Sequence, residues 1–346
     1  MAQGAQVLDA GEVSLPLLRH AQRLLGCDGA ARVEEGRILP LNRLGARLLV
    51  RQQRQVAAAL ARQDFPASFS GRTRPILDAA GAARSYAARV ASLFEADPAA
   101  PPVALFAGRA EVRALAEETL GRAELSLRVE AEEDRMELAP GEIGIWLDET
   151  GEGCVFSDEQ GMLGEAEREL LMAWVALETG ERTLILPVQA TRAADALAAR
   201  YGARVEYVAG EPALWMNALA ERGPAQFDLR SDGIRAAILA LSLLVKRGLS
   251  LEAWRHTLPG VYRRSRAVPV APGRTGRILR VFADRERDVE LGGGVRFKRG
   301  DGWAWLCPDE GKPEFRIVAE AASAETAKEL CDFCESELRR LAGGRG

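Results

Sequence analysis

Two cysteines near the C-terminus have a spacing that could hold a metal ion or form a redox pair. Cys331 and Cys334 are separated by two residues, as zinc ligands and dithiol motifs are. They form a single pair inside a helical pattern, and the only histidines in the chain are His20 and His256. The cysteines are therefore predicted to lie on a buried helix face, and histidine-based metal sites or catalytic triads are strongly disfavoured.

Arginine is concentrated in one segment of the last third of the chain. A run of this kind could contact RNA or a nucleotide. The residues alternate with Val and Pro on a predicted strand, so a solvated face is the favoured interpretation. The run consists of Arg263, Arg264, Arg266, Arg274, Arg277 and Arg280.

Composition indicates a cytoplasmic globular protein of more than one compact unit. The 346 residues are 47% hydrophobic and 28% charged, with a net charge of −4, which disfavours nucleic acid as a partner. The five cysteines are scattered and odd in number, so a disulfide framework is not expected. The N-terminus lacks the pattern of a secretory signal, and no stretch is apolar for long enough to span a membrane.

Strands and helices alternate through the middle of the chain. A linker rich in Pro and Ala at 96–102 separates this part from the N-terminal segment, where helices are predicted at 15–25, 44–63 and 80–94. The alternation implies sheets covered by helices. Strands are expected at 103–107, 125–130, 143–147, 154–157, 183–186 and 204–208, and helices at 109–120, 165–178, 191–200 and 212–221.

The last third has a different pattern, in which strands are flanked by helices. An apolar helix beginning near Asp232 and a shorter one capped by Ser250 come first. Strands at 261–270, 289–298, 302–307 and 315–320 follow, with helices at 276–284 and 324–341. This arrangement predicts a small C-terminal α+β domain.

Ordered landmarks along the chain resemble the phosphohexomutases, that is, the phosphomannomutase/phosphoglucomutase superfamily. GWAWLCPDEGKPEFR at 302–316 is similar in frame to their C-terminal segment, where Gly-Trp leads to Arg-Pro-Ser-Gly-Thr-Glu-Pro. Asp232-Gly233 opening an apolar helix, and IGIWLDETGEGCVFSDEQG at 143–161, have counterparts in the same order. The resemblance is closest to the divergent mutase-like domains fused to mannose-1-phosphate guanylyltransferases.

The resemblance implies an α/β fold of mixed sheets covered by helices, with a C-terminal α+β domain. It predicts a truncated first mutase-like domain at 1–97 and two α/β units at 98–223, divided into about 98–160 and 161–223. Linking helices and the C-terminal domain would occupy 224–346. The implied cofactor is Mg²⁺ and the implied substrate is a hexose phosphate.

Two loops that carry the family's chemistry have no match here. The phosphoserine loop, Thr-Ala-Ser-His-Asn-Pro, should fall near Gly29 to Pro40, a stretch without Ser or His. Ser14 precedes a helix and is expected to have a structural role in a turn. The sugar loop, Gly-Glu-x-Ser-Gly-His, should precede Asp228, where only RGPAQF at 222–227 is found. No catalytic residue is therefore assigned.

The metal segment of the family is Asp-Gly-Asp-x-Asp-Arg, and this chain retains only part of it. Asp148 matches the first ligand, whereas Thr150 stands at the second, Glu152 at the third, and Gly153 replaces the arginine. Carboxylates on a turning loop can supply the oxygen ligands that Mg²⁺ prefers. Two interpretations remain: a residual Mg²⁺ site formed by Asp148 and Glu152, or an acidic solvated turn, which the substitutions favour.

The terminal phosphate loop is acidic in this chain. Lys312 and Arg316 are the two cations that could bind a phosphate, and three acidic residues, Asp309, Glu310 and Glu314, bring the net charge of 309–316 to −1. Such a loop would repel a sugar phosphate, whereas backbone N–H groups and positive charge would attract it. A plain β-turn is the favoured interpretation.

Three functions follow as hypotheses. The first is a catalytically inactive mutase-like module of sugar-phosphate or nucleotide-sugar metabolism that supports or regulates a sugar nucleotidyltransferase. The second is an active intramolecular phosphotransferase on hexose phosphates with an atypical donor and Mg²⁺ loop. The third is a structural or interaction protein that retains only the fold.

Overall fold

The computed structural model describes residues 5–34, 36–63, 76–78, 81–130, 137–309 and 312–343. The chain divides into two compact units. One unit comprises residues 1–178 and 219–256, and the other comprises 179–218 and 257–346. The three-part division at 97 and 223 stays a prediction.

The first unit is built on a five-stranded mixed sheet with the order β6-β5-β7-β8-β9. Strand β5 pairs in parallel with both β6 and β7, and the remaining pairs are antiparallel. The central strands form because they are short, apolar runs, and Leu105 and Ile145 are fully buried in them. The strands are β5 (Val103–Ala107), β6 (Leu127–Glu130), β7 (Ile143–Leu147), β8 (Cys154–Asp158) and β9 (Gly161–Met162).

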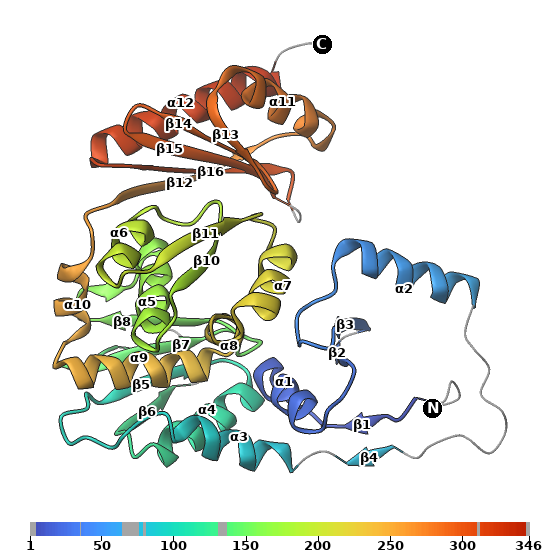
Figure 1. The fold of residues 1–346 in the computed structure, drawn as a ribbon, viewed down its shortest axis with the longest axis vertical. Coiled ribbons are helices and arrows are strands. Elements are labelled where there is room, and N and C mark those ends of the chain that lie inside the picture. The colour runs from blue at the N-terminus through green and yellow to red at the C-terminus, as the bar shows by residue number, and fades with distance from the viewer. Residues whose placement is uncertain are drawn as a thin grey trace. The chain divides into compact units, whose positions relative to one another are not determined.

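Helices pack against this sheet and against one another. Helix α4 (Ala110–Arg122) contacts β5 and β6, and α9 (Gly233–Arg247) contacts β7 and β8 (Figure 1). Asp232 caps α9 by accepting the Arg235 N–H at 3.0 Å, and Gly248 ends the helix with φ 61°. The other helices of this layer are α3 (Ala82–Ala91), α5 (Glu165–Glu178), α8 (Pro224–Ser231) and α10 (Leu251–Thr257).

The N-terminal part of the first unit contains only short strands and helices. Helix α1 (Leu15–Leu24) contacts α3, and β1 (Leu8–Asp9) pairs in parallel with β4 (Leu77–Asp78). Strands β2 (Ala30–Glu34) and β3 (Arg37–Leu41) form an antiparallel hairpin. Helix α2 (Val50–Arg62) follows and has no buried residue.

The second unit combines a parallel strand pair with a five-stranded antiparallel sheet. Strands β10 (Thr183–Pro187) and β11 (Arg204–Val208) are joined through α6 (Ala193–Arg200). Helix α7 (Pro212–Arg222) begins in this unit and ends in the first. The larger sheet has the order β12-β16-β15-β14-β13, formed by β12 (Tyr262–Pro269), β13 (Arg287–Leu291), β14 (Val295–Arg299), β15 (Gly302–Pro308) and β16 (Glu314–Ala321).

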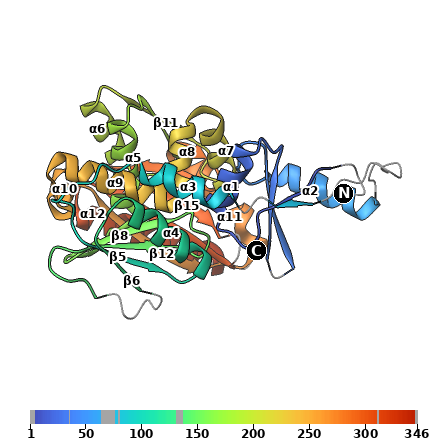
Figure 2. The same cartoon turned by 90° about the horizontal axis from the view of Figure 1, so that it is seen from below.

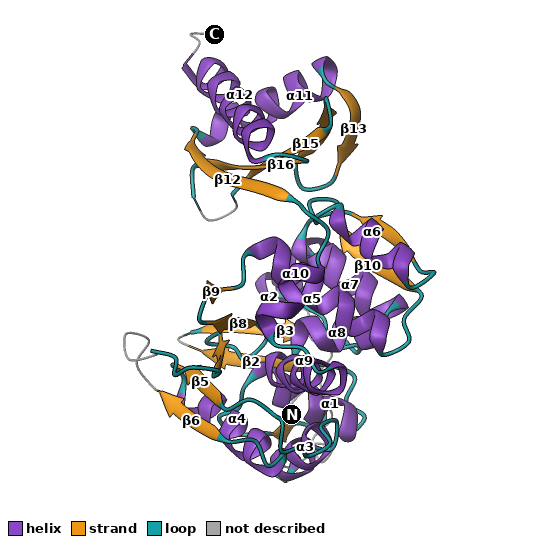
Figure 3. Ribbon diagram, turned by 90° about the vertical axis from the view of Figure 1, so that its left-hand side faces the viewer, coloured by secondary structure: helices purple, strands orange, loops and turns teal. Residues whose placement is uncertain are grey.

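One face of the antiparallel sheet is covered by α11 (Thr275–Arg285) and α12 (Ala324–Gly343), as Figure 3 shows. A short 3₁₀ helix, η2 (Pro272–Arg274), precedes α11. The core between sheet and helices contains Phe297, Ile317 and Leu338, all fully buried. Cys331 and Cys334 lie in this core, as their helical spacing predicted, and burial raises the pKa of both thiols.

The structure differs from the sequence-based assignment in several places. Residues 289–298 form a hairpin rather than one strand, because Gly292–Gly294 turn the chain between β13 and β14. The helix expected from residue 44 begins at Val50, because Asn42 accepts the N–H groups of Leu44 and Ala46 and holds a turn. Residues 224–231 form a helix, α8, in a stretch for which no helix was predicted.

Candidate functional site

The acidic loop between β7 and β8 is closed by its own hydrogen bonds. Asp148 Oδ1 accepts the Thr150 N–H at 2.9 Å and the Thr150 hydroxyl at 2.8 Å, and Oδ2 accepts the Gly153 N–H at 2.7 Å. Gly151, with φ +78°, makes the turn that this geometry requires. The Asp148 carboxylate therefore organises the loop, and both of its oxygens already have donors.

Glu152 binds two arginines from the N-terminal part of the same unit. Its Oε1 pairs with Arg19, and its Oε2 accepts Arg47 Nη2 at 2.7 Å. Burial by itself raises the pKa of Glu152, but the charges and hydrogen bonds of Arg19 and Arg47 outweigh it and hold the pKa below its ordinary value. Glu152 is therefore ionised and neutralised by guanidinium groups.

Arg19 is the buried centre of this arrangement. It comes from α1, and only 2% of its side chain is exposed. Its Nε donates to the Gly45 carbonyl at 2.7 Å and its Nη1 to the Ser231 carbonyl at 3.0 Å, while Nη2 binds Glu152. The guanidinium thus joins α1, the turn before α2, the acidic loop and the end of α8.

The N-terminus of α9 holds the acidic loop from another direction. The Gly233 N–H donates to the Gly151 carbonyl at 2.9 Å. A Cβ at Gly233 would lie 2.7 Å from the Gly153 carbonyl oxygen, so no larger residue fits without displacing the backbone. Beside it, buried Asp232 accepts the Tyr86 hydroxyl at 2.7 Å, and burial raises the pKa of Asp232 to about 6.

The residues of this loop do not fit the Mg²⁺ ion that the resemblance implied. An octahedral Mg²⁺ needs free oxygen ligands, whereas each carboxylate oxygen of Asp148 and Glu152 is engaged by a donor. Displacing Arg19 would leave a guanidinium buried without its partner, which is costly. Thr150 links the two carboxylates through its hydroxyl, at 2.8 Å from Asp148 and 3.3 Å from Glu152.

The segment where the phosphoserine loop should fall is the β2–β3 hairpin. Its cross-strand pairs run from Ala30 with Leu41 to Glu34 with Arg37, and no described residue in it carries a hydroxyl. Ser14 lies at the N-cap of α1, 1% exposed, with its hydroxyl oxygen unpaired. Ser14 is thus enclosed and cannot reach a ligand in this conformation.

The terminal loop lies in the second unit. The Lys312 N–H donates to Asp309 Oδ1 at 2.9 Å, which closes a turn between β15 and β16. Arg316 points from β16 with its Nε 3.5 Å from the Ser265 hydroxyl. Glu310 lies outside the described residues. Of the two expected phosphate-binding cations, Lys312 ends the turn that Asp309 stabilises, and Arg316 follows it in β16.

The segment expected to match the sugar loop, 222–227, joins α7 to α8 instead. Gly223 and Pro224 start α8, and a proline in the first helical position suits this role. Gln226 and Phe227 are buried, and the Arg19 guanidinium lies 5.7 Å from the centre of the Phe227 ring. This segment therefore supports Arg19 by packing.

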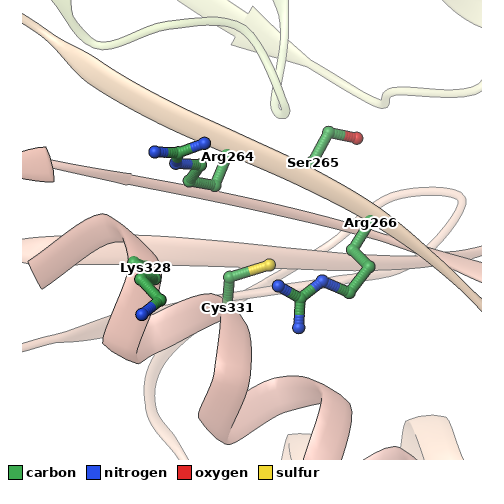
Figure 4. Close-up of a pocket in the computed structure, with 5 residues that line it drawn as sticks. All are labelled: Arg264, Ser265, Arg266, Lys328 and Cys331. Atoms are coloured by element: carbon green, nitrogen blue, oxygen red, sulfur yellow. The ribbon is translucent and has the colours of Figure 1, made fainter. Parts of the chain in front are cut away.

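A pocket of about 190 Å³ lies between β12 and α12 in the second unit (Figure 4). Arg266 is not free to bind a ligand there, because it pairs with Asp332 at 2.9 Å and with Glu335. Neither Lys312 nor Arg316 lines the pocket. Its lining residues are Arg264, Ser265, Arg266, Lys328 and Cys331.

Sequence comparison with known proteins gives a limited match. No family model matches the chain. The probable phosphoglucosamine mutase of Methanopyrus kandleri is 30% identical over 113 residues, which cover 32% of this chain. The match spans only 25% of that relative's length. No helix among the described residues is both long and apolar enough to cross a membrane.

Solved structures show a likeness over nearly the whole chain. A phosphoglucomutase/phosphomannomutase family protein from Burkholderia thailandensis has a TM-score of 0.78 at 16% identity, covering 100% of this chain and 85% of that one. A putative phosphomannomutase from Thermus thermophilus gives 0.65 at 17% identity, with coverage of 99% and 85%. The N-acetylphosphoglucosamine mutase of Aspergillus fumigatus, solved with GlcNAc-6P and magnesium, gives 0.62 at 11% identity, with coverage of 93% and 95%. The fold of this chain is that of the phosphohexomutases.

Proposed function

We propose that this chain is a member of the phosphohexomutase superfamily that does not catalyse the mutase reaction and acts as an accessory module in sugar-phosphate or nucleotide-sugar metabolism. The observation that carries the proposal is the state of the acidic loop. Arg19 and Arg47 occupy both carboxylate oxygens of Glu152, and the loop's own donors occupy those of Asp148. Phosphoryl transfer depends on a cation that neutralises the transferring group.

The other loops support the same proposal. A phosphoryl donor requires an accessible nucleophile, and a hairpin occupies residues 30–41, where the donor serine should be. The terminal loop places the Asp309 carboxylate on the backbone of Lys312, so a negative charge lies where a phosphate dianion would have to bind. Three independent changes thus remove donor, metal and phosphate site together.

An active mutase is the second candidate, and one observation favours it. Asp148 and Glu152 remain on a single loop and are linked through the Thr150 hydroxyl. A rearrangement that released Glu152 from Arg19 would bring two carboxylates toward one cation. This candidate requires that the buried ion pair open during the reaction.

The two candidates are separated by following hexose 1-phosphate by phosphorus NMR, with Mg²⁺ and a hexose 1,6-bisphosphate primer. We expect no conversion to the 6-phosphate above the rate without protein. Conversion that persists in the wild type and disappears in Asp148→Ala would contradict the non-catalytic proposal.

We further propose that the accessory role involves a sugar nucleotidyltransferase in the cytoplasm. Support for this partner comes from the resemblance to mutase-like domains that occur fused to such enzymes. The partner rests on the non-catalytic proposal, because a silent module can act only through another protein or through a bound ligand.

A further inference from the structure

Exposed large hydrophobic side chains are concentrated near the N-terminus. Among the described residues, ten of fourteen such side chains lie between residues 7 and 76, a stretch of about a fifth of the chain. Scattered exposed apolar residues are normal, but a concentration of them marks an interaction surface. The ten are Val7, Leu24, Leu25, Val33, Ile38, Leu44, Val50, Val56, Leu60 and Ile76.

Helix α2 is the clearest part of this concentration. None of its side chains is buried, and no described helix or strand of the same unit makes an extensive contact with it (Figures 1 and 2). At about 100° per residue, its Val and Leu side chains and two of its four alanines fall within an arc of about 140°, in which Gln53 is the one polar residue. The arc contains Val50, Val56, Ala57, Leu60 and Ala61.

A solitary helix of this length needs a partner. Isolated helices shorter than about 12–15 residues are marginal in water, and most helical stability in proteins comes from packing an apolar face. Helix α2 has 13 residues, and none of the described helices or strands of its unit packs extensively on its apolar face. The geometry therefore implies that another surface covers this face when the helix is fully stable.

The charge around α2 limits what that surface can be. Residues 41–63 contain five arginines and no acidic residue. Apart from Arg47, which binds Glu152, no ion pair joins these arginines to another described residue. Arg51, Arg54 and Arg62 lie on one flank of the apolar arc. A partner surface that is complementary to α2 is therefore apolar in its centre, where it meets the apolar arc, and acidic at its rim, where it meets the arginines.

We propose that α2 is a docking helix that inserts its Val56 and Leu60 face into an apolar groove with an acidic rim on another protein. A symmetric pairing with a second copy would bring the arginine flanks together, and such like-charge contacts are costly. An anionic membrane surface is disfavoured because the apolar face has no Trp or Phe, which interfacial helices commonly use. The proposal holds whether or not the chain is catalytically silent.

The test uses the full chain and a fluorescein-labelled amphipathic peptide with leucine on one face and glutamate on both flanks. Two variants add the same charge to opposite faces of α2: Val56→Glu with Leu60→Glu on the apolar face, and Gln52→Glu with Gln55→Glu on the polar face. Fluorescence anisotropy should show at least tenfold weaker binding for the first variant than for the second, because only the first loses buried apolar area. Binding by the wild type should weaken as salt is added.

Three results would overturn the proposal. The first is peptide binding that is absent or is reduced equally in both variants. The second is a dimer in sedimentation velocity that only the Val56/Leu60 variant abolishes, because this would assign the face to a second copy. The third is binding to phosphatidylglycerol vesicles that only the same variant abolishes, because this would assign it to a membrane. Circular dichroism of both variants confirms that the fold is retained, as expected for side chains that are 46% and 57% exposed.

Discussion

Replacing Arg19 by methionine is expected to lower the free energy of unfolding by about 3–5 kcal/mol, the range seen when one partner of a buried ion pair is removed. Methionine keeps the unbranched apolar part of the side chain but removes the guanidinium, so that Glu152 is left with Arg47 alone. The carbonyls of Gly45 and Ser231 also lose their donors, and an unsatisfied buried acceptor costs about 1–3 kcal/mol. Urea denaturation followed by circular dichroism measures the change.

Arg23→Met is the matched control, one turn further along α1. Arg23 pairs with Asp228 at 2.8 Å, but its side chain is 50% exposed. Exposed ion pairs contribute about 0–1 kcal/mol, so this variant should lie close to the wild type. Equal destabilisation by the two variants would show that the Arg19 network has no special role.

The contribution of Asp232 to the stability of the first unit should fall as pH rises toward neutrality. Burial disfavours the charged carboxylate, and although the Arg235 N–H and the Tyr86 hydroxyl favour it, the pKa of Asp232 is raised to about 6. The protonated form is therefore preferred in the folded state. Its stabilising contribution is complete below the unfolded pKa of 3.8 and is lost as pH rises through about 6. A rise of about two pKa units corresponds to about 3 kcal/mol.

Asp232→Asn isolates this contribution, because asparagine is neutral at every pH and can accept the same hydrogen bonds through its oxygen. Relative to this variant, the wild type should lose about 3 kcal/mol of unfolding free energy between about pH 4 and about pH 7. Urea denaturation at each pH gives the difference. A difference that stays flat or increases with pH would mean that Asp232 titrates as an ordinary N-cap carboxylate.

Much of the fold follows from local patterns in the sequence. The strands at 103–107 and 143–147 and the helix at 165–178 have the predicted bounds, because each is an apolar run or a periodic segment between Gly or Pro residues. The β2–β3 hairpin was missed because its exposed Val33 and Ile38 give no alternation with a buried face. Helix α8 was not predicted from Gly223-Pro224, although proline favours the first turn of a helix.

Only part of the candidate site could be predicted from the sequence. Asp148 and Glu152 were found because they match a family segment, but Arg19 and Arg47 were not, since they lie more than 100 residues away along the chain. One signal was available. Arg19 stands four residues after Leu15, on the face of α1 that is buried, and a charged residue at such a position requires a partner of opposite charge.

Under the non-catalytic proposal, the arginine network takes over the charge-neutralising role that a divalent cation would otherwise have. A divalent cation would neutralise the acidic loop from within the site, whereas here Arg19 and Arg47 neutralise Glu152 from α1 and from the turn before α2. These two ion pairs connect the N-terminal part of the first unit to the acidic loop. On this proposal, the fold is retained while the acidic loop, where a metal would act, is closed by its own donors and by arginine.

Isothermal titration of Mg²⁺ into the wild type and into Asp148→Ala tests this account most directly. Because every carboxylate oxygen of Asp148 and Glu152 already has a donor, we predict no saturable heat at millimolar Mg²⁺ and the same weak response from both proteins. Saturable binding by the wild type that Asp148→Ala abolishes would contradict the account, since the acidic loop would then be a metal site.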